Sequence, residues 1–426
     1  MKICALTHTY PRFANDINAP FVEQLMERVA AKGSEVAVLT AWDPEWNRLP
    51  DDHKVDLRTY RYVWPGRLHI LGYSRTIEGN VRFRTRVLLL SPLLFLFGFL
   101  SFLRLVREKR PDVLHAHWIL PNGFIAALVS RATGIPLLIQ LHGSDVFTAE
   151  KNALFRLMAR FAASRASFIV SPSPDLAARL GALGVDTGKI GIVPNTVDAG
   201  FCDTVTDEAV DTLRSRLGVP EGARVVLAMG RMVHVKGFSY LLDAFRRIAW
   251  EFPDTSLVLA GGGTLFGDMR VLADTLGIGD RVFMPGAVDR EEAPVYFRMA
   301  ELFVVPSVRH ESGAVDGLPV VVPEAMAAGL PVIASAVGGI PVLVHDCVTG
   351  ILVPERDPRA LADALRRLLA DPDTCRRYGD CARRIIDNSV NYDRVAEHFS
   401  LIYREIARGT PPDRFPSFTI SEEPQQ

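Results

Sequence analysis

Short apolar runs recur along the chain, and many are followed by a turn and then by apolar positions at helical spacing. The first run covers residues 3–6, a helical pattern follows over residues 22–30, and a second run covers residues 35–40. Runs that are apolar throughout are typical of strands buried on both faces of a parallel sheet. Gly33 stands where the helical pattern stops, as expected of a helix cap. The pattern predicts a βαβ unit.

The same alternation restarts in the second half of the chain, from Arg224. We therefore predict an α/β protein with two Rossmann-like, doubly wound parallel-sheet domains that face each other across a crevice. Residues 41–80 have no clear period and are assigned to no element. The predicted divisions are an N-terminal domain over 1–195, a C-terminal domain over 203–375, C-terminal helices over 376–408 that pack back toward the N-terminal domain, and a disordered tail over 411–426.

Composition agrees with a soluble protein of two domains, because 48% of the 426 residues are apolar and 23% are charged. A net charge of −1 gives no general attraction to nucleic acid, so no such partner is expected. Five scattered cysteines without a Cys-x-x-Cys pair argue against a disulfide framework and against a cysteine zinc site. Together with the lack of a visible secretory signal, they predict a cytoplasmic protein.

An uncharged run over Val87–Leu103 is dense in leucine and phenylalanine and is flanked by arginines on both sides. It is shorter than the roughly 20 apolar residues of a membrane span, and Pro92 and Gly98 interrupt it. A core helix, an interfacial helix on anionic lipid and a true span are all open interpretations. The strand expected at residues 112–117 makes a span awkward, so a peripheral contact with the inner face of the cytoplasmic membrane is the furthest expectation.

The segment Gly230–Gly237 lies between an expected strand and an amphipathic helix, so it is a strand-to-helix loop. A helix N-terminus presents free N–H groups and the positive end of the helix dipole. Arg231 and Lys236 add two cations that suit phosphate oxygens. An ordinary connection with two solvated cations is the alternative. We interpret the loop as a diphosphate site.

Polar residues also follow other expected strands. His142 and Asp145 come after the strand at 136–141, where a ligand-facing polar pair and a structural pair are equally open. Gly262 belongs to a glycine cluster that allows close backbone approach to a ligand. Asp316 and Glu324 are eight residues apart, and carboxylates accept hydrogen bonds from sugar hydroxyls, although solvated acids near a helix start are the alternative.

In combination these motifs resemble the family 4 retaining glycosyltransferases of the GT-B fold. The residues that carry the resemblance are Gly230-Arg231-x4-Lys236-Gly237, Asp316-x7-Glu324, His115-Ala-His-Trp118, His142-Gly-Ser-Asp145 and residues 324–334. The similarity covers nearly all of residues 1–405. It implies transfer of a sugar from a nucleotide-diphosphate sugar, such as a UDP- or GDP-sugar, to an acceptor with retention of anomeric configuration and without a required metal.

The resemblance also implies roles for single residues. Arg231 and Lys236, beside Gly230 and Gly262, would hold the donor diphosphate and stabilise the leaving group. Glu324 would bind the ribose, and His142 would contact the transferred sugar near the reacting carbon. The remaining assignments are Asp316, Gly317 and Leu318 to the transferred sugar or distal phosphate, and Tyr10, Arg12 and Asp145 to the acceptor side.

Three departures from the family pattern stand out. Asp316 replaces a more usual glutamate, the usual glycine-rich first loop is absent over residues 12–20, and Pro323 precedes Glu324. The expected acceptor is a saccharide, either lipid-linked or part of a cell-surface polysaccharide. A sugar-nucleotide epimerase or phosphorylase on the same fold, and a non-catalytic sugar-nucleotide-binding protein, are the alternatives.

Overall fold

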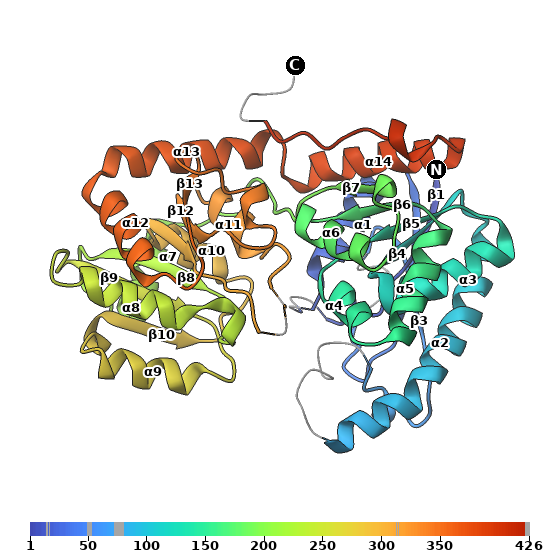
Figure 1. Cartoon of the computed structure of the whole chain (residues 1–426), viewed down its shortest axis with the longest axis horizontal. Helices are drawn as coiled ribbons and strands as arrows, with labels where there is room; N and C mark the ends of the chain where they lie inside the picture. Colours follow the sequence, from blue (N-terminus) through green and yellow to red (C-terminus); the bar gives the residue numbers. More distant parts are fainter. Residues whose placement is uncertain are drawn as a thin grey trace. The chain divides into compact units, whose positions relative to one another are not determined.

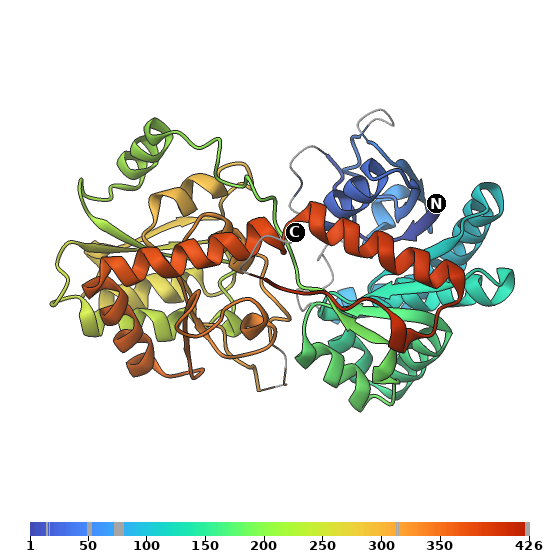
Figure 2. The ribbon, with the colours of Figure 1, turned by 90° about the horizontal axis from the view of Figure 1, so that it is seen from above.

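The computed structural model describes residues 1–13, 16, 18–48, 53–71, 81–311, 313 and 315–421, and the side chains of residues 81–88 are outside this description. The chain forms two compact units (Figures 1 and 2). Unit 1 comprises Met1–Val193 and Tyr392–Phe418, and unit 2 comprises Pro194–Asn391 and the residues from Thr419 onward. Each unit is built on its own sheet.

Unit 1 contains a parallel sheet of seven strands in the order β3-β2-β1-β4-β5-β6-β7. Helices α1 and α14 cover one face, and helices α2 to α6 supply the core on the other. The bounds are β1 (Lys2–Leu6), α1 (Pro20–Ala31), β2 (Glu35–Ala41), β3 (Asp56–Tyr60), η2 (Gly66–Leu68), α2 (Val81–Lys109), β4 (Val113–His117), η3 (Ile119–Gly123), α3 (Phe124–Thr133), β5 (Leu137–Gln140), α4 (Ser144–Glu150), α5 (Ala153–Arg165), β6 (Ala166–Ser171), α6 (Pro174–Ala182), η4 (Thr187–Lys189), β7 (Ile190–Ile192), α14 (Tyr392–Arg408) and η8 (Pro412–Arg414).

Unit 2 contains a parallel sheet of six strands in the order β10-β9-β8-β11-β12-β13. Helices α8, α9 and α12 share one hydrophobic core with the sheet, and α13 packs on α11. The bounds are α7 (Asp207–Leu217), β8 (Arg224–Met229), η5 (His234–Lys236), α8 (Phe238–Ile248), β9 (Thr255–Ala260), α9 (Phe266–Thr275), η6 (Gly279–Arg281), β10 (Val282–Gly286), α10 (Ala293–Met299), β11 (Leu302–Val305), α11 (Val321–Ala327), β12 (Val332–Ser335), η7 (Ile340–Val342), β13 (Gly350–Val353), α12 (Pro358–Ala370) and α13 (Pro372–Asn388).

The strand order of both sheets is that of a doubly wound Rossmann fold, which confirms the predicted fold class. In each sheet the winding reverses between the first and the fourth strand of the unit, which are β1 and β4 in unit 1 and β8 and β11 in unit 2. Ligands of open α/β sheets bind beyond the carboxyl ends of the strands at such a switch point. The loop Gly230–Gly237 and the loop that carries Asp316 follow the two switch-point strands of unit 2.

The C-terminal residues depart from the predicted division in two ways. The group expected over 376–408 is divided after Asn391, because α13 belongs to unit 2 and α14 belongs to unit 1. Gly379 permits the α13 contact, since a Cβ there would lie 2.0 Å from the carbonyl oxygen of Gly329.

The tail expected to be disordered packs on unit 1 over its first part. The rings of Phe415 and Phe168 have centroids 4.4 Å apart, and the ring of Phe418 lies 5.1 Å from that of His398. Two aromatic anchors outweigh the proline-rich, polar composition on which the prediction rested. Residues 422–426 lie outside the described residues.

Helix α2 holds the apolar run, and one of its faces packs in the core of unit 1, as the first interpretation expected. Phe102 and its neighbours on the inner face are buried in the core of unit 1, and Gly98 allows close packing against Ile125 and Tyr60. The outer face exposes Leu89, Leu96, Phe97 and Leu100. Over Leu89–Lys109 the helix is long and apolar enough to cross a membrane by length and composition, with a mean hydropathy of 2.1. Its inner face is nevertheless part of the core.

Phe102→Ala and Leu96→Ala separate the two faces of α2. Phe102 is 0% exposed and Leu96 is 51% exposed. We expect Phe102→Ala to lower the free energy of unfolding by about 3 to 5 kcal/mol, because it leaves a cavity. The matched variant Leu96→Ala should change it by less than about 0.5 kcal/mol. Urea unfolding followed by circular dichroism measures both, and equal losses would contradict the assignment of the two faces.

Candidate active site

The loop after β8 is shaped by glycines at both ends. Gly230 has φ of +153° and Gly237 has φ of +66°, a region that L-residues with side chains rarely adopt. A Cβ on Gly237 would lie 1.9 Å from the carbonyl oxygen of Pro306, which follows β11. The loop after β8 therefore lies in direct backbone contact with the loop after β11. Glycine at position 237 is required by both conformation and space.

Helix α8 begins directly after this loop and is anchored by its buried apolar face. Its apolar face, which includes Leu241, Phe245 and Ile248, is fully buried in the core of unit 2. Gly237 occupies the N-cap position and offers no side chain to cap the first turn. The end of the helix therefore presents backbone N–H groups and a positive dipole toward the carboxyl edge of the sheet.

The two predicted cations are placed differently. The Nζ atom of Lys236 lies 3.0 Å from Oδ2 of Asp316, and the hydroxyl of Ser307 donates a hydrogen bond of 3.1 Å to the same oxygen. Arg231 is exposed, and within the described ranges of the chain no hydrogen bond or ion pair of its guanidinium is recorded. The structure brings Lys236 and Asp316 together and leaves Arg231 free to meet an anion.

Neighbouring loops close around this pair through further backbone contacts. A Cβ on Gly261 would lie 1.9 Å from the carbonyl oxygen of Gly230, and one on Gly338 would lie 2.1 Å from that of Asp316. The carbonyl oxygen of Gly262 accepts a hydrogen bond of 2.8 Å from the N–H of Met232. The predicted glycine cluster thus braces the loop Gly230–Gly237 from the side of β9.

The start of α11 completes the group in unit 2. Gly317 and Leu318 precede it, and the Leu318 carbonyl accepts a hydrogen bond of 2.6 Å from Nδ2 of Asn195. Pro323 lies in the first turn, where the lack of an N–H is tolerated, so the helix begins at Val321 as the proline requires. Glu324 is partly buried in that turn, and burial raises its pKa to about 7, against a lowering contribution from Arg290.

His142 in unit 1 stands at the carboxyl end of β5 within a group of aromatic rings. Its Nε2 atom lies 3.2 Å from Nδ1 of His117, and its ring centroid lies 4.2 Å from that of Trp118 and 5.0 Å from that of Phe21. Burial, followed by the nearby His117 and His8, lowers the pKa of His142 well below its ordinary value. The imidazole is therefore neutral near pH 7 and can donate or accept a hydrogen bond.

Asp145 has a structural position in place of the predicted acceptor-side one. Its side chain is buried and accepts hydrogen bonds from the backbone N–H groups of Ile119 at 2.7 Å, Gly143 at 2.9 Å and His142 at 3.3 Å. These bonds join the loops after β4 and β5. The carboxylate fixes the backbone of His142, which favours a structural role for Asp145 itself.

Tyr10 and Arg12 also differ from the acceptor-side prediction. Tyr10 is fully buried within the core that β1 shares with α1. Arg12 is 6% exposed, and its guanidinium contacts Asp16, Asp43 and Glu45. Three carboxylates therefore neutralise a cation that the sequence suggested was available. Arg12 braces the loop after β1.

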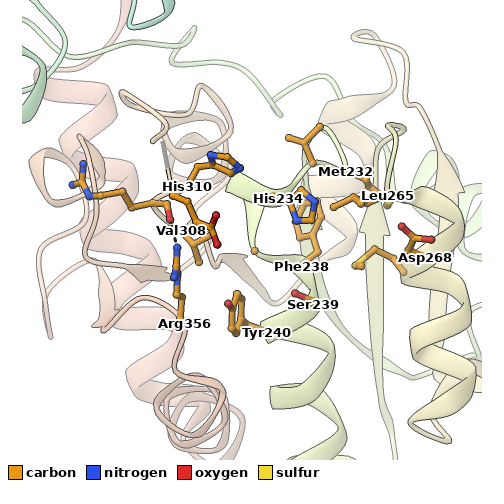
Figure 3. A pocket seen from close by; sticks show the side chains of 15 residues that line it. Met232, His234, Phe238, Ser239, Tyr240, Leu265, Asp268, Val308, His310 and Arg356 are labelled. Atoms are coloured by element: carbon orange, nitrogen blue, oxygen red, sulfur yellow. Dashed lines mark hydrogen bonds between the residues drawn. The ribbon is translucent and has the colours of Figure 1, made fainter. Parts of the chain in front are cut away.

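A cavity of about 570 Å³ borders the loop Gly230–Gly237 on unit 2. Figure 3 shows His234 and His310 facing it from the loops after β8 and β11, with ring centroids 6.4 Å apart. Arg356, at one side, donates a hydrogen bond to the backbone carbonyl of Arg309. The cavity is lined by Gly237 and Phe238 at the start of α8, but not by the predicted cations Arg231 and Lys236.

Comparisons with known proteins identify the family to which this chain belongs. Residues 19–196 match the family model "Glycosyl transferase 4-like domain", and residues 209–385 match the model "Glycosyl transferases group 1". The chain is a family 4 glycosyltransferase of the GT-B fold. The predicted resemblance is thereby confirmed, and so is glycosyl transfer as the class of reaction.

Individual relatives agree with this glycosyltransferase assignment. The alpha-D-kanosaminyltransferase of Streptomyces kanamyceticus is 28% identical over 398 residues, which are 90% of this chain and 98% of that protein. The D-inositol 3-phosphate glycosyltransferase of Xylanimonas cellulosilytica is 30% identical over 319 residues, which are 70% and 73% of the two chains. Among solved structures, Anabaena Alr3699/HepE in complex with UDP has a TM-score of 0.73 at 18% identity, over 95% of this chain and 100% of that one.

Several residues of the glycosyltransferase site were not found from the sequence. His117 contacts His142, and Ser307 contacts Asp316, although neither was assigned a role. The His115-Ala-His-Trp118 motif was a signal for His117, because it ends a strand beside the one that precedes His142. No local pattern marked Ser307 or the cavity beside His234, since both depend on which loops lie next to each other.

The raised pKa of Glu324 makes the stability of the glycosyltransferase depend on pH. The folded state holds this proton up to about pH 7, whereas the ordinary value is 4.5, so the folded state binds more protons in between. The contribution of Glu324 to the free energy of unfolding therefore falls as pH rises through this window and levels off above it. We expect the wild type to lose stability relative to Glu324→Gln from about pH 5 to about pH 7. Urea unfolding of both proteins across this range measures the difference, and a pH-independent difference would contradict the shift.

Proposed function

We propose that this glycosyltransferase moves a sugar from a UDP- or GDP-sugar to a saccharide acceptor with retention of anomeric configuration. The observation that carries the proposal is the loop after β8, which presents an exposed Arg231, a paired Lys236 and the N-terminus of α8 at the switch point of the sheet. Two cations and a helix dipole suit a diphosphate, which carries its charge on several closely spaced oxygens.

The proposed contacts with the donor are made by side chains at the carboxyl edge of the sheet in unit 2. Arg231 and Lys236 bind the diphosphate and stabilise the negative charge that develops on it as the glycosidic bond breaks. Glu324, in the first turn of α11, accepts hydrogen bonds from the two ribose hydroxyls when it is ionised. The UDP complex of the Anabaena protein supports a nucleotide-sugar donor for this fold.

The transferred sugar is assigned to the loop after β11 and to His142. Asp316 already holds Lys236 at 3.0 Å, which keeps both side chains ordered before the donor binds. Its carboxylate would repel the diphosphate, so we assign it, with the backbone of Gly317 and Leu318, to sugar hydroxyls. His142 contacts the sugar as a neutral imidazole. Retention rests on the family resemblance.

Arg231→Ala and Lys236→Ala test the donor site without knowledge of the acceptor. A thermal-shift screen of UDP, GDP and their sugar conjugates identifies the nucleotide that raises the unfolding temperature of the wild type. Because each variant loses charge-assisted hydrogen bonds, we expect it to bind this nucleotide about ten- to a hundredfold more weakly. Turnover should fall by about a hundredfold or more, since these contacts strengthen as the diphosphate leaves.

Arg246→Ala is the matched control, because Arg246 is an exposed arginine on α8 outside the loop. It should bind the nucleotide and turn over like the wild type. Unchanged nucleotide affinity in both Arg231→Ala and Lys236→Ala would overturn the assigned roles. Product analysis on the acceptor separates transfer from epimerisation, which changes the donor alone, and from phosphorolysis, which requires orthophosphate.

We further propose that the acceptor is lipid-linked and that the enzyme works on the inner face of the cytoplasmic membrane. The support is the outer face of α2, where Leu89, Leu96 and Leu100 are exposed at helical spacing. Arg104 and Arg107 continue the exposed side toward the end of the helix. An apolar stripe that ends in arginines suits the boundary between acyl chains and anionic headgroups.

Liposome flotation tests this membrane contact. We expect the wild type to float with anionic vesicles and to bind neutral vesicles several-fold more weakly, because each arginine near the surface contributes about 1 kcal/mol. The double variant Leu96→Glu/Leu100→Glu should remain unbound, since it places two charges on the buried side of the interface. Val271→Glu in α9, another exposed apolar position, should float like the wild type. Equal flotation of all three proteins would exclude α2 as the contact.

A further inference from the structure

A second group of polar side chains lies in unit 1, away from the residues assigned to the donor and to His142. Glu23 and Glu27 are one turn apart on α1, and His53 lies against both. The Nδ1 atom of His53 is 3.5 Å from Oε1 of Glu23 and 3.8 Å from Oε1 of Glu27. One ligand atom from each of the three residues lies within 4.8 Å of the other two.

The histidine at the centre of this group has a buried side chain, and its Nδ1 atom faces the two carboxylates at ion-pair distances. The side chain of His53 is 1% exposed, and neither ring nitrogen has a hydrogen-bond partner within the described part of the chain. The hydroxyl of Tyr10, whose ring centroid is 5.9 Å from that of His53, is buried and lacks a partner in the same residues. Buried polar atoms usually have close partners, and among the described residues Nε2 of His53 and the hydroxyl of Tyr10 have none.

The separations are those of ligands around one metal ion. Distances of 3.5 and 3.8 Å are too long for good hydrogen bonds. Ligand atoms about 2.1 Å from a tetrahedral metal lie about 3.4 Å from each other, which is close to both values. One imidazole nitrogen with two carboxylates is a ligand set for zinc and its first-row neighbours, whereas magnesium prefers oxygen alone.

The charges around the group agree with a cation. Two carboxylates face the imidazole, and Arg48 forms an ion pair with Glu23. Arg48 contacts Oε1 of Glu23, the same oxygen that faces His53, so this oxygen would bind the ion while keeping its contact with Arg48. With a neutral His53, Arg48 and Lys54 balance the charges of Glu23 and Glu27, so the attraction for a divalent ion comes from the carboxylate oxygens that face the imidazole.

We propose that Glu23, Glu27 and His53 bind one divalent transition-metal ion, with Zn²⁺ as the representative. The ion joins α1 to His53, beside Tyr10 in the loop after β1. Its role is to hold this edge of unit 1 together. The proposal is independent of glycosyl transfer and of the donor contacts in unit 2.

Zinc titration of the metal-free full-length protein tests the site. We expect one Zn²⁺ per chain by calorimetry and elemental analysis, and a higher unfolding temperature with Zn²⁺ than with Mg²⁺. His53→Gln and Glu27→Gln each remove a ligand, so the affinity of this site should fall by about a hundredfold or more. Circular dichroism checks whether each variant is folded. If His53→Gln does not fold, Glu27→Gln still tests the site.

His310→Gln is the control, because His310 is an exposed histidine of unit 2 and its loss should leave zinc affinity unchanged. Three results would overturn the proposal. These are no stoichiometric zinc in the wild type, the same zinc affinity in both ligand variants as in the wild type, and equal stabilisation by Zn²⁺ and Mg²⁺. The first would identify the group as a buried ion pair in which His53 holds a proton between the two glutamates.

Discussion

The backbone contact between the loops after β8 and β11 is the constraint on which the donor side of this glycosyltransferase depends. Gly237 lies so close to the carbonyl of Pro306 that no side chain fits between them. Gly261 and Gly338 repeat this arrangement with Gly230 and Asp316. Four loops that lie far apart in the sequence are thereby held at fixed positions by backbone contacts. Because the backbone of both loops is fixed, Lys236 and Asp316 are held close enough to form an ion pair of 3.0 Å.

The two units use the same sheet topology for different kinds of chemistry. In unit 2 the charged groups stand at the carboxyl edge, where Arg231 is exposed and Lys236 and Glu324 are partly buried. In unit 1 the loops are braced from within by Asp145 and Arg12, and a neutral His142 is the polar group left at the edge of its aromatic cluster. Each of these two buried charges in unit 1 is matched by a partner or by several N–H donors, as a buried charge requires.

Helix α2 shows how one element can serve two environments. Its inner face packs around Gly98 and Phe102 as part of the core, while its outer face leaves leucines in contact with solvent. The exposed leucines on one stripe are the observation behind the proposed membrane contact. The sequence alone favoured no single interpretation, because hydropathy along a run does not distinguish the two faces of a helix.

The pattern of apolar runs and helical spacing determined the fold class and the strand-to-helix position of Gly230–Gly237, and the cations Arg231 and Lys236 predicted a diphosphate site there. These features are local, since each depends on residues that are neighbours in the chain. The structure alone decided that Arg12 and Asp145 are buried braces, that residues 411–418 pack on unit 1, and that His53 lies between Glu23 and Glu27. Each of these depends on contacts between segments distant in sequence. The sequence determines which residues are charged. The packing of the folded chain determines whether each charged side chain contacts water, another side chain or a ligand.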